Sequence, residues 1–373
     1  MASEHGAATG GAADAAHMAL ALEAARRGWG RTAPNPMVGA VLVRSGEVIG
    51  VGWHAQYGEA HAEVMALDAA GERARGATMY VTLEPCAHFG KTPPCVQALI
   101  RAGVSRVVIA ARDPNPEARG GLERLRTSGV TVETGLLAEP ARELNAPFYF
   151  SFGSDRPWVT LKLALSLDGA MADASGRSKW ITGPASRAEV HAMRAGSDGV
   201  AVGINTALAD DPWLTVRDAP APSMPPARVI FDRRARLPLD GILARSARAA
   251  PTVLVAESAP ASRRLALEAA GVEVLQAASL EESLVLLRRR SIRSLLVEGG
   301  RTLAAALLER ALVDRLVIFQ APVILGAGAL RPFDRVPATD LTAASALRVV
   351  ERRPFGDDLM TVYAMRELPC SPD

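Results

Sequence analysis

Apolar and polar positions along the chain follow two patterns, which are short apolar runs and longer segments with an apolar residue every three or four positions. The runs predict strands and the periodic segments predict helices. In the first part of the chain, strands are predicted at 38–43, 47–52, 77–83, 106–111 and 130–135. Helices are predicted at 14–27, 61–73, 93–103, 123–128 and 138–152. Strands that alternate with helices in this way indicate a three-layer α/β domain.

A boundary follows at 151–157, SFGSDRP, where Gly, Ser, Asp and Pro gather. A second series of strands opens at Trp158 and continues at 198–203, 227–232, 251–256, 272–275, 294–300, 315–325, 346–351 and 359–365. Helices are predicted between them at 184–195, 260–270, 280–289 and 301–310. We therefore expect a mobile tail at 1–13, one domain at 14–153 and a second α/β domain at 156–373.

Composition narrows the class of protein. Of the 373 residues 49% are hydrophobic, and the net charge of +2 comes from 42 basic and 40 acidic residues without a basic block. Charge alone therefore gives no support for nucleic-acid binding. Three cysteines cannot build a disulfide framework, and no segment has the pattern of a signal peptide or the length of a membrane span. We expect a cytoplasmic protein.

Residues with metal-binding chemistry gather between His61 and Cys95, a stretch that holds two of the three cysteines and two of the six histidines. His61, Cys86 and Cys95 suit a catalytic zinc, which takes three protein ligands and keeps a fourth position for water. Glu63, next but one after His61, is then free to move protons without being a ligand. The zinc nucleobase deaminases divide the work in this way.

A simpler explanation exists for each of these residues taken alone. His61 can be a residue at a helix start, and the cysteines can be small core residues. The spacing between Cys86 and Cys95 also exceeds the usual Cys-x-x-Cys. A His-x-Glu followed by two cysteines in one short window, after a proline, weakens that explanation, so we favour the zinc site.

Several longer motifs surround these residues. The first part holds TAPNPMVGAVLV, GWHAQYGEAHAEVMAL, GATMYVTLEPCAHFGKTPPC and DPNP, and the second holds LKLALSLDGAMADASGRSKWITG, AMRAGSDGVAVGINTALADDPWLTVR and LLVEGGRTLAAALL. Together they resemble the bifunctional deaminase/reductase family of riboflavin biosynthesis, from residue 14 to residue 365. A long gap between the cysteines is normal in that family. One departure is visible in DPNPEARGGLERL, where Gly120 and Gly121 are adjacent and the loop after Asn115 is one residue short.

The resemblance implies a cytidine-deaminase-like first domain that removes the exocyclic amine of a diaminopyrimidine carrying a ribosylamino phosphate. Asn35 and His54, both next to strand ends, are our candidates for contacts with the ring. His88 and Lys91, between the two cysteines, are our candidates for the phosphate. A solvated loop residue without a role is an equal alternative for each of these last two.

For the second domain, the resemblance implies a dihydrofolate-reductase-like fold that reduces the ribosyl group of the deaminated product to ribityl. The chain has no strand–GxGxxG–helix unit. Instead, LLVEGGRTLAAALL predicts a strand, two glycines and a helix. Backbone N–H groups at this turn can face a pyrophosphate, and they belong to Gly299, Gly300, Arg301, Thr302 and Leu303.

Further residues of the second domain match positions of the family. The positions that hold the substrate are Ser178, Arg194, Leu214 and Arg217. The positions that contact the cofactor are Ala164, Trp180, Thr206 and Asp210. Lys162 lies inside an apolar strand, which is unusual for lysine, and Glu298 ends another. A lysine on a solvated sheet face is the alternative, but we expect Lys162 and Glu298 to form an active-site pair.

The expected ligands follow from these assignments. We expect one Zn²⁺ per chain, a small pyrimidine ribonucleotide as substrate, NADPH as cofactor, and a homo-oligomer. The 2′-phosphate of NADPH needs a cationic seat, and Arg233 directly follows the strand 227–232. An arginine that merely faces solvent is the alternative there.

Two other classes of protein fit less well. A zinc deaminase that edits nucleic acid needs a basic channel and stacking aromatics, whereas charge is balanced here and aromatics make up 5%. A zinc-stabilised binding protein with decayed sites would lack some of the residues that the chemistry needs, and all of them are present.

Overall fold

The computed structural model describes residues 5–334, 336 and 347–367. The chain divides between Gly153 and Ser154 into two compact units. Within these ranges, no helix combines the length and the apolar character that crossing a membrane requires.

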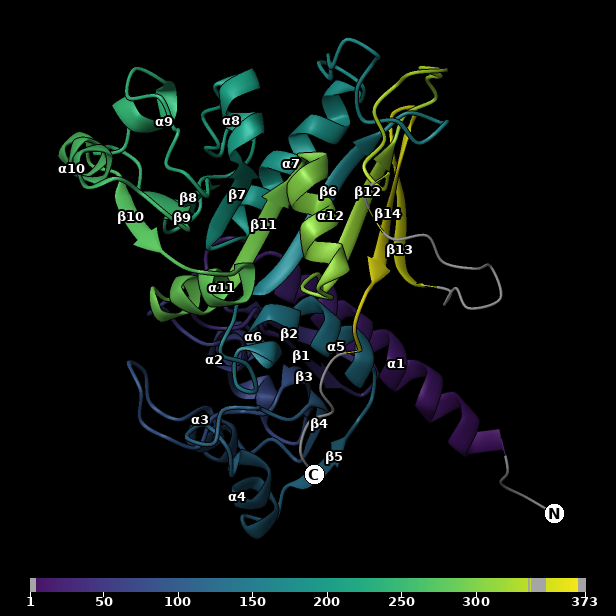
Figure 1. Ribbon diagram of the computed structural model, residues 1–373. Coiled ribbons are helices and arrows are strands. Elements are labelled where there is room, and N and C mark those ends of the chain that lie inside the picture. The colour runs from purple at the N-terminus through teal and green to yellow at the C-terminus, as the bar shows by residue number, and fades with distance from the viewer. Residues whose placement is uncertain (1–4, 335, 337–346, 368–373) are drawn as a thin grey trace. The chain divides into compact units, whose positions relative to one another are not determined.

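The first unit contains a five-stranded sheet (Figure 1). Its strands are β1 (Gly39–Arg44), β2 (Glu47–Trp53), β3 (Thr78–Leu83), β4 (Arg106–Ala111) and β5 (Thr131–Thr134). They lie in the order β2-β1-β3-β4-β5, with β1 antiparallel to β2 and β3, and with β3, β4 and β5 parallel. The parallel strands β3 and β4 therefore end at the same edge of the sheet, where the loops with Cys86 and Asp113 begin.

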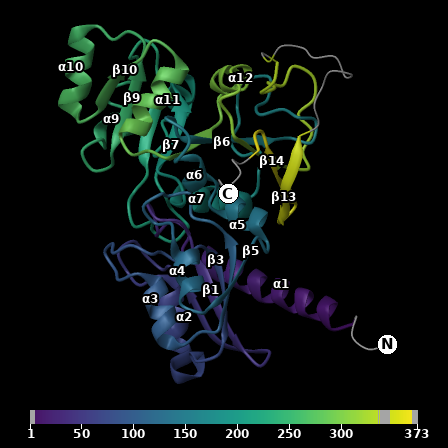
Figure 2. The same cartoon turned by 90° about the horizontal axis from the view of Figure 1, so that it is seen from below.

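Helices cover both faces of this sheet. They are α1 (His5–Arg26), α2 (Ala62–Ala70), η1 (Gly71–Ala74), α3 (Cys95–Ala102), α4 (Gly121–Thr127), α5 (Ala138–Leu144) and α6 (Ala146–Phe150). Leu42 and Ile109 face the core shared with α2, α3 and α4, whereas Val41 and Val108 face the core shared with α1, α5 and α6. Figure 2 shows α2 and α3 on one side of the sheet and α1 on the other. This is the predicted three-layer α/β arrangement.

The largest differences from the helices predicted for the first unit are at α1 and at 138–152. α1 begins at His5 rather than at Asp14, so residues 5–13 are helical where we expected a tail, and residues 1–4 lie outside the described residues. The single helix predicted at 138–152 is divided into α5 and α6 at Asn145. At this division the Asn145 side chain bonds to the backbone of Met37: it accepts a hydrogen bond from Met37 N–H and donates one to Met37 O, both at 2.8 Å.

The shortened loop after Asn115 depends on its two glycines. Gly120 has a φ of 93°, in the left-handed region that favours glycine. A Cβ on Gly121 would lie 1.9 Å from the carbonyl oxygen of Pro85, so only glycine allows α4 to begin there. The loop therefore packs directly against the turn that carries Cys86.

The second unit contains a nine-stranded sheet. Its strands are β6 (Trp158–Leu165), β7 (Gly199–Gly203), β8 (Ala227–Phe231), β9 (Thr252–Ala256), β10 (Glu273–Gln276), β11 (Ser294–Glu298), β12 (Arg315–Gln320), β13 (Arg348–Phe355) and β14 (Asp358–Ala364). The order is β10-β9-β8-β7-β11-β6-β12-β14-β13, in which all neighbours from β10 to β12 are parallel and the last two pairs are antiparallel. Mixed sheets with an antiparallel edge are common in α/β folds.

The helices of the second unit are α7 (Pro184–Ala195), α8 (Ile204–Asp210), α9 (Ile242–Arg245), α10 (Ala261–Ala270), α11 (Leu280–Arg289) and α12 (Arg301–Glu309). α8 and α9, of seven and four residues, were not predicted. β12 ends at Gln320 and not at 325, because Leu167 N–H donates to Val323 O and Val323 N–H to Ala321 O in a turn. Residue 346 of the strand predicted at 346–351 lies outside the described residues.

We predict that Gly121→Ala destabilises the first unit. The new Cβ must displace the Pro85 carbonyl, and overpacking of this kind costs about 1–3 kcal/mol. The control is Gly153→Ala, because nothing lies within 4 Å of a Cβ at that position. Thermal unfolding should show a lower midpoint for Gly121→Ala than for Gly153→Ala, and equal midpoints would contradict the close approach of α4 to Pro85.

Candidate active sites

Three candidate metal ligands meet at the carboxyl edge of β3 in the first unit. The ligand atoms of His61, Cys86 and Cys95 all lie within 4.8 Å of one another. His61 Nδ1 is 3.2 Å from Cys95 Sγ and 3.6 Å from Cys86 Sγ. His61 directly precedes α2 and Cys95 begins α3, so two helix starts and one strand end supply the set. Within the described ranges, no other group of His, Cys, Asp and Glu side chains has this geometry.

Contacts among these side chains shift their pKa values in different directions, and the hydrogen bond with Cys86 raises the pKa of Cys95. Hydrogen bonds from Cys95 and His61 lower the pKa of Cys86, which favours the thiolate that binds metals. The contact with Cys86 raises the pKa of His61. Glu63 is 3% exposed, and burial raises the pKa of its carboxyl group. One imidazole nitrogen and two sulfurs are the ligand types that zinc accepts in catalytic sites, so the residues fit the expected metal.

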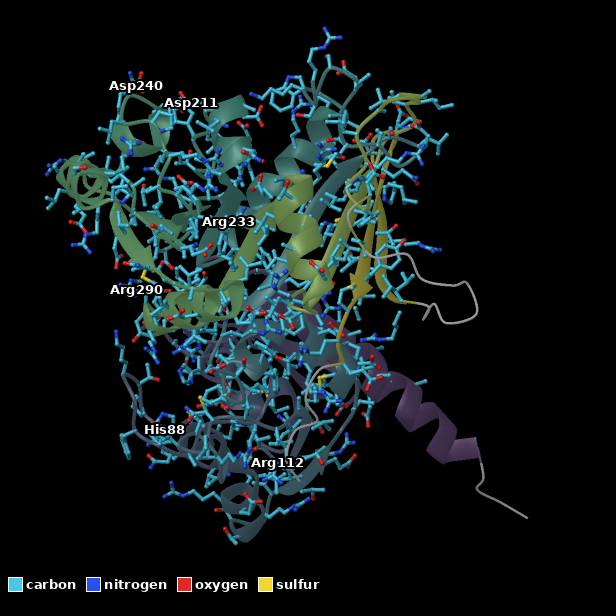
Figure 3. All side chains as sticks on the ribbon, viewed as in Figure 1. His88, Arg112, Asp211, Arg233, Asp240 and Arg290 are labelled. Atoms are coloured by element: carbon cyan, nitrogen blue, oxygen red, sulfur yellow. The ribbon has the colours of Figure 1, made fainter. Side chains whose placement is uncertain are left out.

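A cavity of about 260 Å³ opens beside this cluster. It is lined by candidates from the sequence, which are Asn35, His54, His61, Glu63, Cys86, His88 and Lys91. Asn35 Nδ2 donates to His54 Nε2 at 3.3 Å, a direction that follows if His54 Nδ1 donates to Ala60 O at 3.2 Å. The Lys91 ammonium lies 4.0 Å from the centre of the Tyr57 ring. His88 and Lys91 are both exposed, and Figure 3 shows His88 on the loop that follows β3.

The same cavity is lined by two residues for which we predicted no role, Asp113 and Asn115. Asp113 is 6% exposed, and burial raises its pKa to about 7. Its Oδ1 accepts a hydrogen bond from Asn115 N–H at 2.8 Å. The available signal was the polar turn DPNP directly after the buried strand 106–111, since such loops often carry functional groups.

A larger cavity, of about 1470 Å³, lies in the second unit around the ends of β6, β7, β8 and β11. Ligands of open α/β sheets bind at the carboxyl ends of the strands. The volume exceeds the range of about 300–1000 Å³ that is typical for one small ligand, so it offers room for two. The cavity is lined by all the sequence candidates of this unit, which are Lys162, Ala164, Ser178, Trp180, Arg194, Thr206, Asp210, Leu214, Arg217, Arg233, Glu298, Gly299, Gly300, Arg301, Thr302 and Leu303.

The direct hydrogen-bond partner of Glu298 is Arg194, and the active-site pair of Lys162 and Glu298 stays a prediction. Lys162 and Glu298 are register neighbours on the parallel strands β6 and β11, but the Glu298 carboxylate accepts two hydrogen bonds from Arg194, that from Nη2 being 2.8 Å long. Burial alone would raise the pKa of Glu298, yet the Arg194 guanidinium outweighs it and lowers that pKa. Burial lowers the pKa of Lys162, whose ammonium lies 5.7 Å from the centre of the Phe319 ring. Arginine suits this direct contact better than lysine, because two N–H groups of its planar guanidinium can donate to the two carboxylate oxygens at once.

The turn between β11 and α12 has the backbone that a phosphate site needs. Gly299 and Gly300 both have positive φ, of 63° and 83°, and α12 begins directly after them. A Cβ on Gly300 would lie 2.9 Å from Thr206 Oγ1, so α8 approaches this turn closely. Arg233 follows β8 by two residues, is exposed, and is seen near the middle of this unit in Figure 3.

Comparisons with known proteins agree with this division of the chain. Residues 12–111 match the family model of the cytidine and deoxycytidylate deaminase zinc-binding region, and residues 157–361 match that of the RibD C-terminal domain. The riboflavin biosynthesis protein RibD of Aquifex aeolicus is 44% identical over 84% of this chain and 88% of its own. That of Escherichia coli is 42% identical over 93% of this chain and 98% of its own.

Two solved structures extend the likeness to the fold. RibD of Acinetobacter baumannii is 39% identical with a TM-score of 0.82, over 95% of this chain and 99% of its own. A deaminase/reductase of Thermotoga maritima is 36% identical with the same TM-score and coverage. These matches do not favour a nucleic-acid editor. The chain belongs to the RibD family of riboflavin biosynthesis, whose members carry a zinc-binding deaminase domain and a reductase domain in one polypeptide.

Proposed function

We propose that residues 14–153 deaminate 2,5-diamino-6-ribosylamino-4(3H)-pyrimidinone 5′-phosphate and that residues 156–373 reduce the ribosyl group of the product to ribityl. The cluster of His61, Cys86 and Cys95 beside Glu63 carries the first part of this proposal. The Thermotoga maritima relative supports the choice of substrates, because it is described as a diaminohydroxyphosphoribosylaminopyrimidine deaminase and 5-amino-6-(5-phosphoribosylamino)uracil reductase.

In the deaminase site, His61, Cys86 and Cys95 would hold one zinc ion. Bound there, zinc would supply Lewis-acid activation of water. Glu63 lines the same cavity without belonging to the ligand cluster, so its carboxylate is placed to move both protons of the attacking water in turn. The first would go to the ring nitrogen, and the second, from the added hydroxyl, to the amine that leaves as ammonia. Burial holds the carboxyl group away from bulk solvent, where its proton would be lost.

Substrate binding in this site would divide into a ring end and a phosphate end. Asn35 and His54 are hydrogen-bonded to each other, so each restricts the orientation of the other at the cavity. His88 and Lys91 lie on the exposed loop between the two cysteines, where a phosphate can reach them from solvent. The Tyr57 ring holds the Lys91 ammonium at the cavity.

In the reductase site, charged and hydroxyl groups would bind the deaminated substrate. The proposed contacts are Lys162, Ser178, Arg194, Leu214, Arg217 and Glu298. The Arg194–Glu298 ion pair fixes a carboxylate and a guanidinium beside each other, so that ribose hydroxyls and the phosphate each meet a group of suitable charge. Arg217 is exposed at the cavity and is free to reach the phosphate.

The rest of this cavity would hold NADPH, which supplies the hydride for the reduction. The proposed contacts are Ala164, Trp180, Thr206, Asp210, Arg233, Gly299, Gly300, Arg301, Thr302 and Leu303. The backbone N–H groups at the start of α12 would face the pyrophosphate. Arg233 would bind the 2′-phosphate and set the preference for NADPH over NADH. The homo-oligomer expected from the sequence stays a prediction, which light scattering of the purified protein would test.

We predict that Glu63→Gln keeps the zinc and loses deamination. The ligands stay intact, while the missing proton carrier should lower the rate by about 10²–10⁴-fold. Elemental analysis gives the zinc content, and ammonia release gives the rate. The same variant should still reduce the deaminated intermediate when it is supplied, and loss of that reduction would contradict two separate sites.

Lys162→Met should give the reciprocal result. The variant keeps an unbranched side chain that is shorter by one heavy atom, and it removes the ammonium from the cavity of the second unit. Reduction should fall by about 10–100-fold, the worth of a hydrogen bond to a charged group. Ammonia release in the same preparation serves as the control and should not change. A variant that still reduces at the unmutated rate would remove Lys162 from the site.

For cofactor preference, we expect Arg233→Ala to raise the Michaelis constant for NADPH by about 10–100-fold and to leave that for NADH nearly unchanged, because only NADPH carries the 2′-phosphate. Arg290→Ala is the matched control, since Arg290 is exposed on the same unit but does not line the cavity (Figure 3). Equal effects on both cofactors would show that Arg233 has a structural role.

A further inference from the structure

The loop after α8 presents Leu214 and Arg217 to the cavity of the second unit in an unfavourable backbone conformation. Three residues in it have positive φ although none is glycine, with 40° at Asp211, 52° at Leu214 and 53° at Asp218. Such conformations crowd the Cβ and persist only where the surroundings hold them. The contacts of this loop therefore decide where Leu214 and Arg217 lie.

Four hydrogen bonds from outside the loop hold it in place. Near its start, Asp211 Oδ1 accepts from Ile242 N–H at 2.7 Å, and Trp213 O accepts from Arg228 at 3.4 Å. The other two come from α7, where Arg194 Nη1 donates to Thr215 O at 2.9 Å, and His191 Nδ1 accepts from Arg217 N–H at 3.0 Å. Only the last of these bonds fixes Arg217 itself.

His191 lies where it can orient Arg217 in the substrate site without contacting the reacting atoms. It lies one helical turn before Arg194 on α7, so both side chains lie on the same helix face. His191 is 9% exposed and lines the cavity, as Arg194 and Arg217 do. Burial lowers the pKa of His191, and the charges of Arg194 and Arg217 lower it further, so the ring stays neutral and Nδ1 keeps the lone pair that accepts the Arg217 N–H.

We propose that His191 is a positioning residue of the reductase, which sets the Arg217 guanidinium toward the substrate phosphate by holding the Arg217 backbone through Nδ1. The proposal rests on the proposed function, because Arg217 as a substrate contact is part of it. Arg194 cannot take over this role, because its guanidinium has no acceptor for the Arg217 N–H. The acceptor of that N–H is His191 Nδ1. The alternative is a buried histidine that only stabilises the unit.

A pair of amide variants separates these two roles. In His191→Asn, the amide oxygen takes the place of Nδ1 and can accept the Arg217 N–H. In His191→Gln, the amide has the same polarity but lies one bond further from the backbone. Steady-state kinetics with supplied deaminated intermediate and NADPH gives the Michaelis constant for the intermediate and kcat. Fluorescence titration with NADPH gives the affinity for the cofactor. An unchanged affinity shows that the cavity of the second unit is still folded.

The positioning role predicts a difference between the two variants. His191→Gln should raise the Michaelis constant for the intermediate by about 3–10-fold, the worth of one hydrogen bond, with kcat and NADPH affinity little changed. For His191→Asn, the Michaelis constant for the intermediate should stay within about twofold of that of the unmutated protein, because the amide oxygen keeps the one hydrogen bond. Equal kinetics for the two variants, or loss of NADPH affinity in either, would overturn the role of His191.

Arg217→Met tests the assumption beneath this proposal. If it leaves the Michaelis constant for the intermediate unchanged, Arg217 does not bind the substrate, and the proposed function of this residue fails together with that of His191. If Arg217→Met raises the Michaelis constant but His191→Gln does not, the substrate assignment stands and only the positioning role of His191 is overturned.

Discussion

Parallel strands end at the same edge of their sheet, and both sites of this chain depend on that constraint. In the first unit, β3 and β4 are parallel neighbours, so Cys86 after β3 and Asp113 after β4 line one cavity. In the second unit, β6, β7, β8 and β11 place Lys162, Arg233 and Glu298 around another. Residues far apart in sequence meet because the strands bring them to one edge, and short helices then supply the remaining groups.

The two sites differ in how their charged side chains are paired. In the first, His61, Cys86 and Cys95 concentrate ligand atoms that suit one cation, and Glu63 is buried beside them. In the second, Glu298 is already paired with Arg194. A buried ion pair contributes little to stability once desolvation is counted, so its presence at a cavity is better explained by the substrate than by the fold.

Much of the fold was predictable because its strands are short apolar runs between clear breaks. β4, α7 and α11 have the predicted bounds, whereas α8 and α9 were missed because one or two turns show no period. Pro147, two residues after the division at Asn145, was a local signal for it, because its ring nitrogen cannot donate a helical hydrogen bond. The contact of Asn145 with the distant Met37 leaves no local pattern.

The predictability of the sites has the same limit. The motif His-x-Glu with two cysteines, together with the resemblance to a family, indicated a set of residues that the structure brings to two cavities. Which side chains bond to each other was not visible: Arg194 hydrogen-bonds to Glu298, and the active-site pair of Lys162 and Glu298 stays a prediction. A contact with a single backbone N–H, such as that of His191 with Arg217, leaves no pattern in the sequence and is seen only in the structure.

The most direct test of two independent sites is removal of the metal from the intact chain. Zinc is extracted with a chelator, and ammonia release from the diaminopyrimidine substrate and NADPH oxidation with supplied deaminated intermediate are measured on the same sample. Independence of the two sites predicts that ammonia release stops and returns when zinc is added back, while NADPH oxidation continues unchanged. Loss of both activities together, or deamination that survives without zinc, would contradict it.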